Sequence, residues 1–261
     1  MNTYNERHLS TLVRHMVEKD QLPSRLFCYM SVQYPDRLES IFKNNQLWFS
    51  APKDFNDPFD CRVYPEIPNE EDLAHYLSQN SPSATTEQYN EILDGIKRSG
   101  SSEAIAKKAI DDVMNHCGIK CFTDNNKNIL MWSHYGDSHK GICLEFDVLE
   151  DLPFFTYPIK VKYTTEYYHL DFRNPKFVTE LLRSKSVAWS YENEVRIYKK
   201  ESGLHKFNPC SLKTITFGCC ASDDSMNAIK DLVQANPLLN HVICLKASTN
   251  DKEYKLNIQN V

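Results

Sequence analysis

Apolar residues recur along the chain at two spacings, and each spacing predicts one kind of secondary structure. Residues 26–31 and 47–50 are short runs of aromatic and aliphatic side chains, which is typical of β-strands. Between them, apolar positions at helical spacing follow Asp36, and another helical pattern lies within residues 1–22. The start of the chain therefore predicts a helix, a strand, a second helix and a second strand.

A region of different character extends from about residue 66 to residue 117. Glu, Asp, Ser and Asn dominate it, and its last part carries Ile105, Ala109 and Val113 at helical spacing. This pattern predicts two or three amphipathic helices. We interpret the region as a helical insertion into a single domain that spans residues 1–261, and not as an independent domain.

The β-strand pattern returns after this insertion. Short apolar runs predict strands at 118–123, 141–146, 159–163, 194–198, 214–217 and 242–247. Helical spacing predicts helices at 129–135, 174–186 and 223–235. Strands separated by helices of unequal length predict an α+β fold, with a curved, mixed β-sheet against which helices pack. The strand positions expected to be buried in the core are Trp48, Phe49, Ile119, Phe122, Ile142, Leu144, Val195, Ile197, Ile215 and Phe217.

Glycine usage and net charge exclude several classes of protein. The chain has 7 glycines, and no segment reads GxGxxG or GxxxxGK[ST]. Those are the loops that hold phosphates in Rossmann dehydrogenases and in P-loop ATPases. A net charge of −5 without a polybasic segment makes duplex nucleic acid an unexpected partner, although a local groove could still hold a single strand.

Cysteine usage and the N-terminal residues bear on the compartment. The 9 cysteines are scattered and odd in number, which favours reduced thiols in the cytoplasm over a disulfide framework. The first residues lack the apolar core of a signal peptide, and no stretch approaches eighteen apolar residues. We expect a cytoplasmic protein without a membrane partner.

The segment Trp-Ser-Tyr-Glu-Asn-Glu-Val-Arg at 189–196 is the strongest candidate for chemistry. On a strand, Glu192, Glu194 and Arg196 would point to the same face, beside Trp189 and Tyr191. A carboxylate in that position can stabilise a developing oxocarbenium ion or orient a nucleophile. The alternative is a solvated strand face that carries an ion pair.

The segment 131–141 is a second candidate, because Ser133 and His134 fall next to a turn and can form the rim of a pocket. His134, His139 and Glu145 do not have the HExxH spacing of a zinc site, so we expect no metal.

A third candidate lies near the second strand. Ser50 ends that strand, where its hydroxyl can bind the hydroxyl groups of a ligand. The Asn56-Asp57-Pro58 turn that follows can hold a loop over a pocket.

Four motifs occur in an order that resembles a known family. They are LWFSAPKDFNDPFD, CFTDNNKNILMWSHYGDSHKGICLEFD, WSYENEVRIY and a late ITFG. Together they resemble the bacterial and phage family called domain of unknown function 2971 (DUF2971), over most of residues 26–247. The family's name records that its activity is not generally established.

A more distant resemblance concerns the ADP-ribosyltransferases. The first strand, a helix that ends in I-x-x-N-x-Q-L and a strand ending in Ser are similar to the opening of those enzymes, and the late E-x-E is similar to their catalytic motif. The resemblance implies that Glu194 supports glycosidic cleavage of NAD and that Glu192 is its partner. The first-strand position, where those enzymes have His or Arg, falls at Cys28 or Tyr29, which is a departure from the pattern.

These observations lead to one function with two alternatives. The leading hypothesis is an ADP-ribosyltransferase-like enzyme that cleaves NAD at the nicotinamide–ribose bond, with water or a protein or nucleic acid as acceptor. The alternatives are a non-enzymatic nucleotide-sensing or interaction module, for example in phage defence, and a metal-dependent hydrolase or nuclease. The residues expected to contact the substrate are Tyr29, Ser50, Asn56, Asp57, Trp132, Ser133, His134, Tyr135, Trp189, Tyr191 and Arg196.

Overall fold

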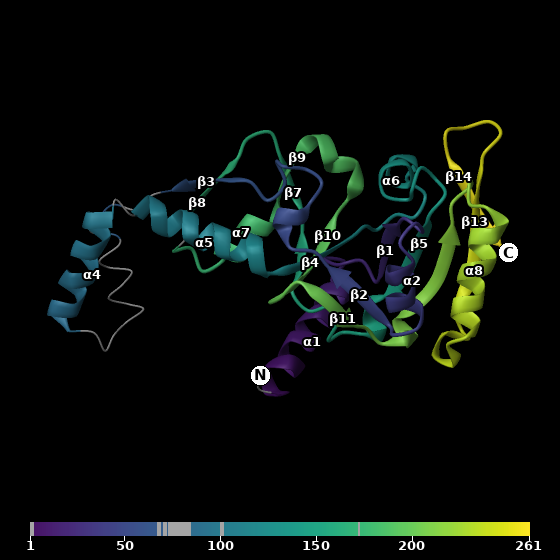
Figure 1. The fold of residues 1–261 in the computed structure, drawn as a ribbon, viewed down its shortest axis with the longest axis horizontal. Helices are drawn as coiled ribbons and strands as arrows, with labels where there is room; N and C mark the ends of the chain where they lie inside the picture. The colour runs from purple at the N-terminus through teal and green to yellow at the C-terminus, as the bar shows by residue number, and fades with distance from the viewer. Residues whose placement is uncertain (1–2, 67–68, 70–71, 73–84, 100–101, 172) are drawn as a thin grey trace. The chain divides into compact units, whose positions relative to one another are not determined.

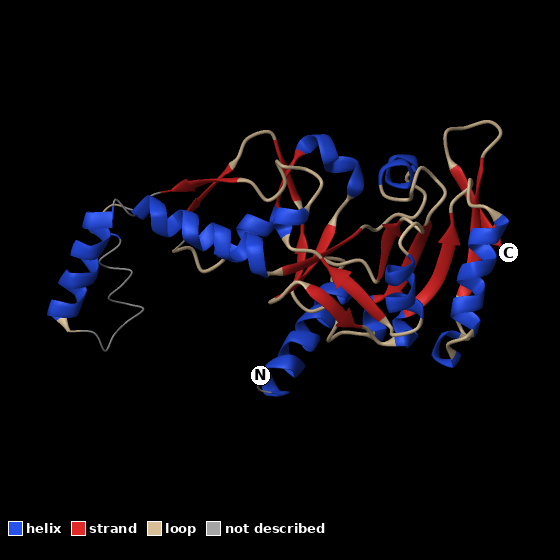
Figure 2. Ribbon diagram, viewed as in Figure 1, coloured by secondary structure: helices blue, strands red, loops and turns tan. Residues whose placement is uncertain are grey.

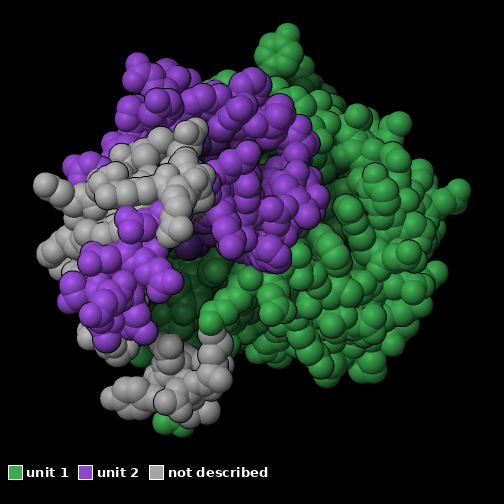
Figure 3. Space-filling view, turned by 60° about the vertical axis from the view of Figure 1, so that its left-hand side comes forward, with its two compact units in different colours: residues 1–50, 118–161, 188–261 green, residues 51–117, 162–187 purple. Residues whose placement is uncertain are grey.

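The computed structural model describes residues 3–261 except 67–68, 70–71, 73–84, 100–101 and 172. The chain forms two compact units (Figure 3). Unit 1 consists of residues 1–50, 118–161 and 188–261, and unit 2 of residues 51–117 and 162–187. Each unit is therefore built from segments that are far apart in the sequence.

The largest sheet of unit 1 has five strands in the order β1-β5-β12-β13-β14 (Figures 1 and 2). Its strands are β1 (Arg25–Met30), β5 (Ile142–Asp147), β12 (Leu212–Phe217), β13 (Ile243–Thr249) and β14 (Leu256–Asn260). The β12–β13 pair is parallel and the other neighbours are antiparallel, so the sheet is mixed. Together with the helices, it confirms the predicted α+β class.

Two smaller sheets complete the strands of unit 1. In the first, β10 (Val195–Lys199) lies between β4 (Gly118–Phe122) and β6 (Pro158–Lys160), with both pairs antiparallel. In the second, β2 (Gln46–Phe49) pairs with β11 (Gly203–Lys206). The helices of unit 1 are α1 (Thr3–Glu18), α2 (Pro35–Phe42), α6 (Ile129–His134) and α8 (Asp223–Gln234). Short 3-10 turns lie at η2 (Val148–Glu150), η4 (Pro209–Ser211) and η5 (Pro237–Leu239), and η3 (Val187–Glu192) leads into β10.

The predicted core positions are buried, with Trp48 as the exception at 48% exposure. In β2, Leu47 and Phe49 are buried on one face and Trp48 lies between them on the other. Successive side chains of a strand point to opposite faces, so Trp48 and Phe49 could not both face the core. The prediction for Trp48 was therefore wrong.

Unit 2 contains two short parallel strand pairs and the helices of the predicted insertion. β3 (Val63–Glu66) pairs with β8 (Tyr168–Asp171), and β7 (Lys162–Thr164) pairs with β9 (Ser184–Ser186). The helices are α4 (Thr86–Ser99), α5 (Ser102–His116), α7 (Phe177–Arg183) and the 3-10 turn η1 (Pro52–Asp54). Within the predicted insertion, residues 67–68, 70–71, 73–84 and 100–101 lie outside the described residues.

Candidate functional site

Two short helices of unit 1, α6 and η3, bring the aromatic residues of both sequence motifs together. Asn128 caps α6, because its Oδ1 accepts hydrogen bonds from the backbone N–H groups of Leu130 (2.9 Å) and Met131 (3.3 Å). Its amide Nδ2 donates to the carbonyl oxygen of Tyr191 in η3, at 2.7 Å. Asn128 therefore both starts α6 and ties it to η3.

The side chains that meet here are called the α6–η3 cluster, and they are His134, Tyr135, Trp189, Tyr191 and Glu192. His134 is exposed, and its Nδ1 lies 2.8 Å from the hydroxyl of Tyr191. Its ring centroid is 6.0 Å from those of both Trp189 and Tyr191, which are themselves 6.0 Å apart. The three rings form a partly exposed aromatic group joined by a polar contact.

A buried carboxylate is hydrogen-bonded to a fourth ring of the cluster. The hydroxyl of Tyr135 donates to Oε1 of Glu192 at 2.7 Å, and Glu192 is only 3% exposed. A charged acceptor makes such a hydrogen bond stronger than one between neutral groups. The Glu192 carboxylate is therefore held against Tyr135 and kept out of bulk water.

The Glu194 carboxylate pairs with a guanidinium in the interior. Nε of Arg196 donates to Oε1 of Glu194 at 2.7 Å, and Nη2 donates to Oε2 at 3.1 Å. Glu194 is 3% exposed and Arg196 has no exposed surface. The pair is bidentate and buried. It is therefore not the solvated ion pair that the sequence offered as the alternative to a functional carboxylate.

Glu192 does not share a strand face with Glu194 and Arg196, and that prediction was wrong. Glu192 ends η3, the next residue Asn193 has a positive φ of 44°, and β10 begins only at Val195. Asn adopts left-handed backbone conformations more readily than most residues. The turn at Asn193 interrupts the alternation of side chains that a continuous strand would require.

Trp132 and Tyr29 support the cluster from the interior. Trp132 is fully buried, and its Nε1 donates to the carbonyl oxygen of Asn126 at 2.9 Å. The ring of Tyr29 packs edge-on against it, with the centroids 5.0 Å apart. The Tyr29 hydroxyl donates to the carbonyl oxygen of Asn125 at 2.8 Å, and burial raises the pKa of this phenol. Both rings present little surface to a ligand.

The tight turn after α6 holds His139 beside a thiol. Asp137, Ser138 and His139 all have positive φ, and a Cβ on Gly136 would lie 2.6 Å from the Trp132 ring. The His139 ring stacks over Trp132, and its Nδ1 is 3.7 Å from Sγ of Cys219. Burial lowers the pKa of His139, which favours the neutral imidazole.

The other residues expected at the site are not members of the cluster as defined above. Ser133 is exposed on α6 itself. Ser50 exchanges backbone hydrogen bonds with Ile119, and among the described residues no hydrogen bond or ring contact joins it to the cluster. Asn56 and Asp57 belong to unit 2, where Oδ1 of Asp57 accepts from the Phe59 N–H at 2.9 Å and forms the predicted turn.

Sequence reasoning missed Asn128, although a signal for it exists. An Asn immediately before the apolar run Ile-Leu-Met-Trp has the pattern of a helix N-cap. Its second contact, to the Tyr191 carbonyl, joins residues 63 positions apart and has no sequence signal.

The described residues contain neither a metal-ligand group nor a membrane-spanning helix. Within those residues, no group of three or more His, Cys, Asp or Glu side chains could hold a metal ion. The helices described there include none that is long and apolar enough to cross a membrane.

The cluster lies in a segment that matches a known family model. No curated protein and no solved structure matches the chain significantly. Residues 131–197, which include most of α6 and the whole of η3, match the family described as "Protein of unknown function (DUF2971)", and this match confirms the resemblance seen in the motifs.

Proposed function

We propose that the chain is an ADP-ribosyltransferase-like enzyme that cleaves the nicotinamide–ribose bond of NAD. The observation that carries the proposal is the buried carboxylate of Glu192, which accepts a hydrogen bond from Tyr135, whose ring lies 6.3 Å from that of His134 in the partly exposed group with Trp189 and Tyr191. The reduced state of all nine cysteines is compatible with the cytoplasm, where NAD is available.

The reaction needs a negative charge and an aromatic wall. When the glycosidic C–N bond breaks, its electron pair stays on the nicotinamide nitrogen and the ribose becomes a cationic oxocarbenium ion. A fixed carboxylate stabilises this charge strongly where water is excluded. The nicotinamide ring would stack on Trp189 or Tyr191, and His134 would contact the ribose hydroxyls. The acceptor, either water or a group on a macromolecule, then bonds to the ribose carbon and releases a proton.

The two carboxylates differ in their position, and this difference suggests a division of roles. Both oxygens of Glu194 accept hydrogen bonds from Arg196, so Glu194 is tied to the strand β10 that carries this guanidinium. Glu192 ends η3, and its Oε1 accepts a hydrogen bond from Tyr135, a member of the cluster. We therefore assign the electrostatic role to Glu192, and to Glu194 the positioning of the strand that follows η3. The resemblance to ADP-ribosyltransferases implied the reverse, with Glu194 supporting cleavage and Glu192 as its partner.

The test is nicotinamide release from NAD and auto-modification, measured for wild type, Glu192→Gln and Glu194→Gln. Glu192→Gln preserves shape but removes the charge, so we expect a loss of about a hundredfold in rate with little change in the melting curve. Glu194→Gln should lower the rate mainly through a lower melting temperature. Glu39→Gln, on the exposed face of α2, is the matched control and should be as active as wild type. Equal activity of Glu192→Gln and wild type would exclude the assigned role.

The burial of both carboxylates also favours a second candidate, a module that binds a nucleotide without reacting with it. Glu192 and Glu194 are each 3% exposed, and a binding module does not need an accessible reactive group. Tight binding of NAD or ADP-ribose in a thermal-shift titration, without any turnover, would favour this candidate.

A further inference from the structure

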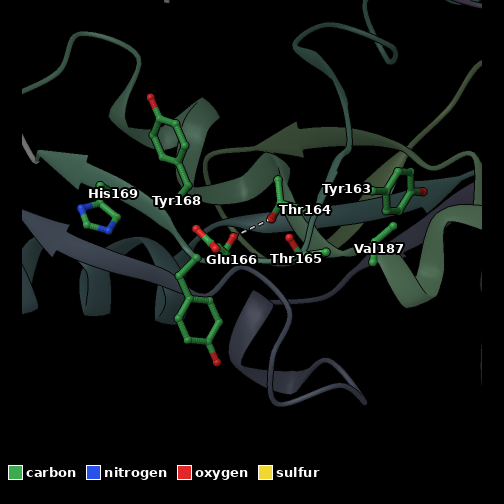
Figure 4. A pocket seen from close by; sticks show the side chains of 8 residues that line it. Tyr163, Thr164, Thr165, Glu166, Tyr168, His169 and Val187 are labelled. Carbon is green, nitrogen blue, oxygen red and sulfur yellow. Dashed lines mark hydrogen bonds between the residues drawn. The ribbon is translucent and has the colours of Figure 1, made fainter.

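Unit 2 contains a pocket of 460 Å³ that belongs to none of the sites described above (Figure 4). It is formed by β7, β8, the turn between them and the first residue of η3. The residues that line it are Tyr163, Thr164, Thr165, Glu166, Tyr167, Tyr168, His169 and Val187. Three phenol rings and an imidazole are thus among the side chains that line this pocket.

Two cations lie over tyrosines of this pocket. The guanidinium carbon of Arg62 is 5.8 Å from the centroid of the Tyr167 ring, and Nζ of Lys162 is 5.7 Å from that of Tyr168. Both cations and Tyr167 are exposed. A ligand that stacks on these rings would therefore have a positive charge within reach on either side. Stacking surfaces flanked by cations are the usual means by which proteins bind single nucleotides or single strands.

A carboxylate also lines the pocket. Figure 4 shows Glu166 between His169 and Tyr168 on one side and Tyr163 and Val187 on the other. The Thr164 hydroxyl donates to the Glu166 backbone carbonyl at 2.7 Å, which fixes the turn that carries this carboxylate. An ionised carboxylate only accepts hydrogen bonds, so its ligand must present donors. Guanine offers two adjacent donors on one edge, adenine and cytosine offer an amino group, and uracil offers a single imide N–H.

We propose that this pocket binds a nucleotide, with the base stacked on Tyr167 or Tyr168 and the phosphate near Lys162 and Arg62. Glu166 selects the base, and guanine is preferred over uracil because its N1–H and N2 amino group can both donate to one carboxylate. The nucleotide is either free or part of a single strand, since both present the same chemistry. This pocket lies entirely in unit 2, so the proposal does not depend on NAD cleavage in unit 1.

The experiment titrates the full chain by calorimetry with GMP, UMP, guanosine and inorganic phosphate. A second arm measures fluorescence anisotropy with a labelled oligothymidylate that does or does not contain one guanine. We expect GMP to bind more tightly than UMP, guanosine or phosphate alone. If only the oligonucleotide with guanine binds, the ligand is a single strand; if only GMP binds, it is a free nucleotide.

Variants connect the binding to the pocket. Tyr167→Ala should weaken binding about tenfold through loss of stacking, and Tyr167→Phe should retain it. Glu166→Gln should reduce the preference for guanine over uracil, and Lys162→Ala should reduce the dependence of affinity on salt. Tyr254→Ala, at a fully exposed tyrosine of unit 1, is the matched control and should bind as wild type does.

The proposal is overturned if no nucleotide or strand binds, if phosphate alone binds as well as GMP, or if Tyr167→Ala binds as tightly as wild type. Binding that is lost in Glu192→Gln but retained in Tyr167→Ala would place the nucleotide in the α6–η3 cluster, and would also contradict the proposal. Failure of NAD cleavage has no bearing on any of these results.

Discussion

At the scale of single residues, the Arg196 guanidinium is notable because a charged group is fully buried. It has no exposed surface and its charge is balanced by Glu194 through two hydrogen bonds. Transfer of both charges out of water is costly, and their attraction repays that cost only when the geometry is good. The loss of either residue should therefore lower the free energy of unfolding, even if the intact pair makes no net contribution to it.

Replacement of Arg196 by Met should lower the free energy of unfolding by about 3–5 kcal/mol, because the buried Glu194 carboxylate loses its guanidinium. Urea denaturation of wild type and variant measures the change. The double variant Glu194→Gln/Arg196→Met removes both charges and should recover part of the loss. A single variant within about 1 kcal/mol of wild type, as for a surface pair, would contradict this account.

A second residue-scale prediction concerns Cys117, where burial raises the pKa of the thiol from 9.0 to about 12. The unfolded thiol ionises above pH 9 while the folded thiol keeps its proton, so this residue's contribution to stability is complete below pH 9. It is lost as the pH rises from 9 toward 12, by about 1.4 kcal/mol for each pH unit. The stability difference between wild type and Cys117→Ala, followed from pH 8 to pH 11, should shrink. A constant difference would show that the thiol does not titrate in this way.

At the scale of elements, α6 is short enough to depend on its cap. A helix of six residues forms few internal hydrogen bonds, so its stability comes from its ends and from packing. Asn128 caps the start of α6 through two hydrogen bonds to its backbone, and it ties α6 to η3 through a third to the carbonyl oxygen of Tyr191. Asn128 therefore contributes to the geometry of the cluster together with the His134–Tyr191 and Tyr135–Glu192 contacts.

Two substitutions of Asn128 separate these roles. Asn128→Asp keeps the oxygen that caps α6 but loses the donor to Tyr191, whereas Asn128→Ala loses both. We expect the alanine variant to be less stable by about 1–2 kcal/mol and the aspartate variant to lie between it and wild type. Equal denaturation midpoints for the two variants would show that the cap contributes nothing.

The strands show which parts of this fold can be predicted from sequence. Val195 and Ile197 are apolar at alternate positions, so the buried face of β10 was predictable. The burial of Arg196 was not, because it follows from the pairing of β10 with β4 on one side and β6 on the other. The turn at Asn193, which precedes β10, could not be predicted either, because Glu-Asn-Glu has the alternation that is typical of a strand. The spacing of apolar residues along the sequence does not indicate which strands will pair.

At the scale of the whole molecule, the division into two units depends on contacts between distant segments. Unit 2 joins residues 51–117 to residues 162–187 through the parallel pairs β3–β8 and β7–β9. Sequence reasoning could detect the helical composition of the first segment but not its partner. For the candidate site, the two motifs were predicted, and His134, Tyr135, Trp189, Tyr191 and Glu192 do meet. The hydrogen bonds that orient them come only from the structure.

We propose that this chain breaks the nicotinamide–ribose bond, and the release of nicotinamide is the decisive measurement. Wild-type protein is incubated with NAD that is radiolabelled in the nicotinamide ring, alone and with protein, single-stranded and duplex nucleic acids as acceptors. We expect labelled nicotinamide to be released, and we expect the rate to be about a hundredfold lower in Glu192→Gln while the melting temperature is unchanged. No release with any acceptor, from a protein that is folded by its melting curve, would contradict the proposal.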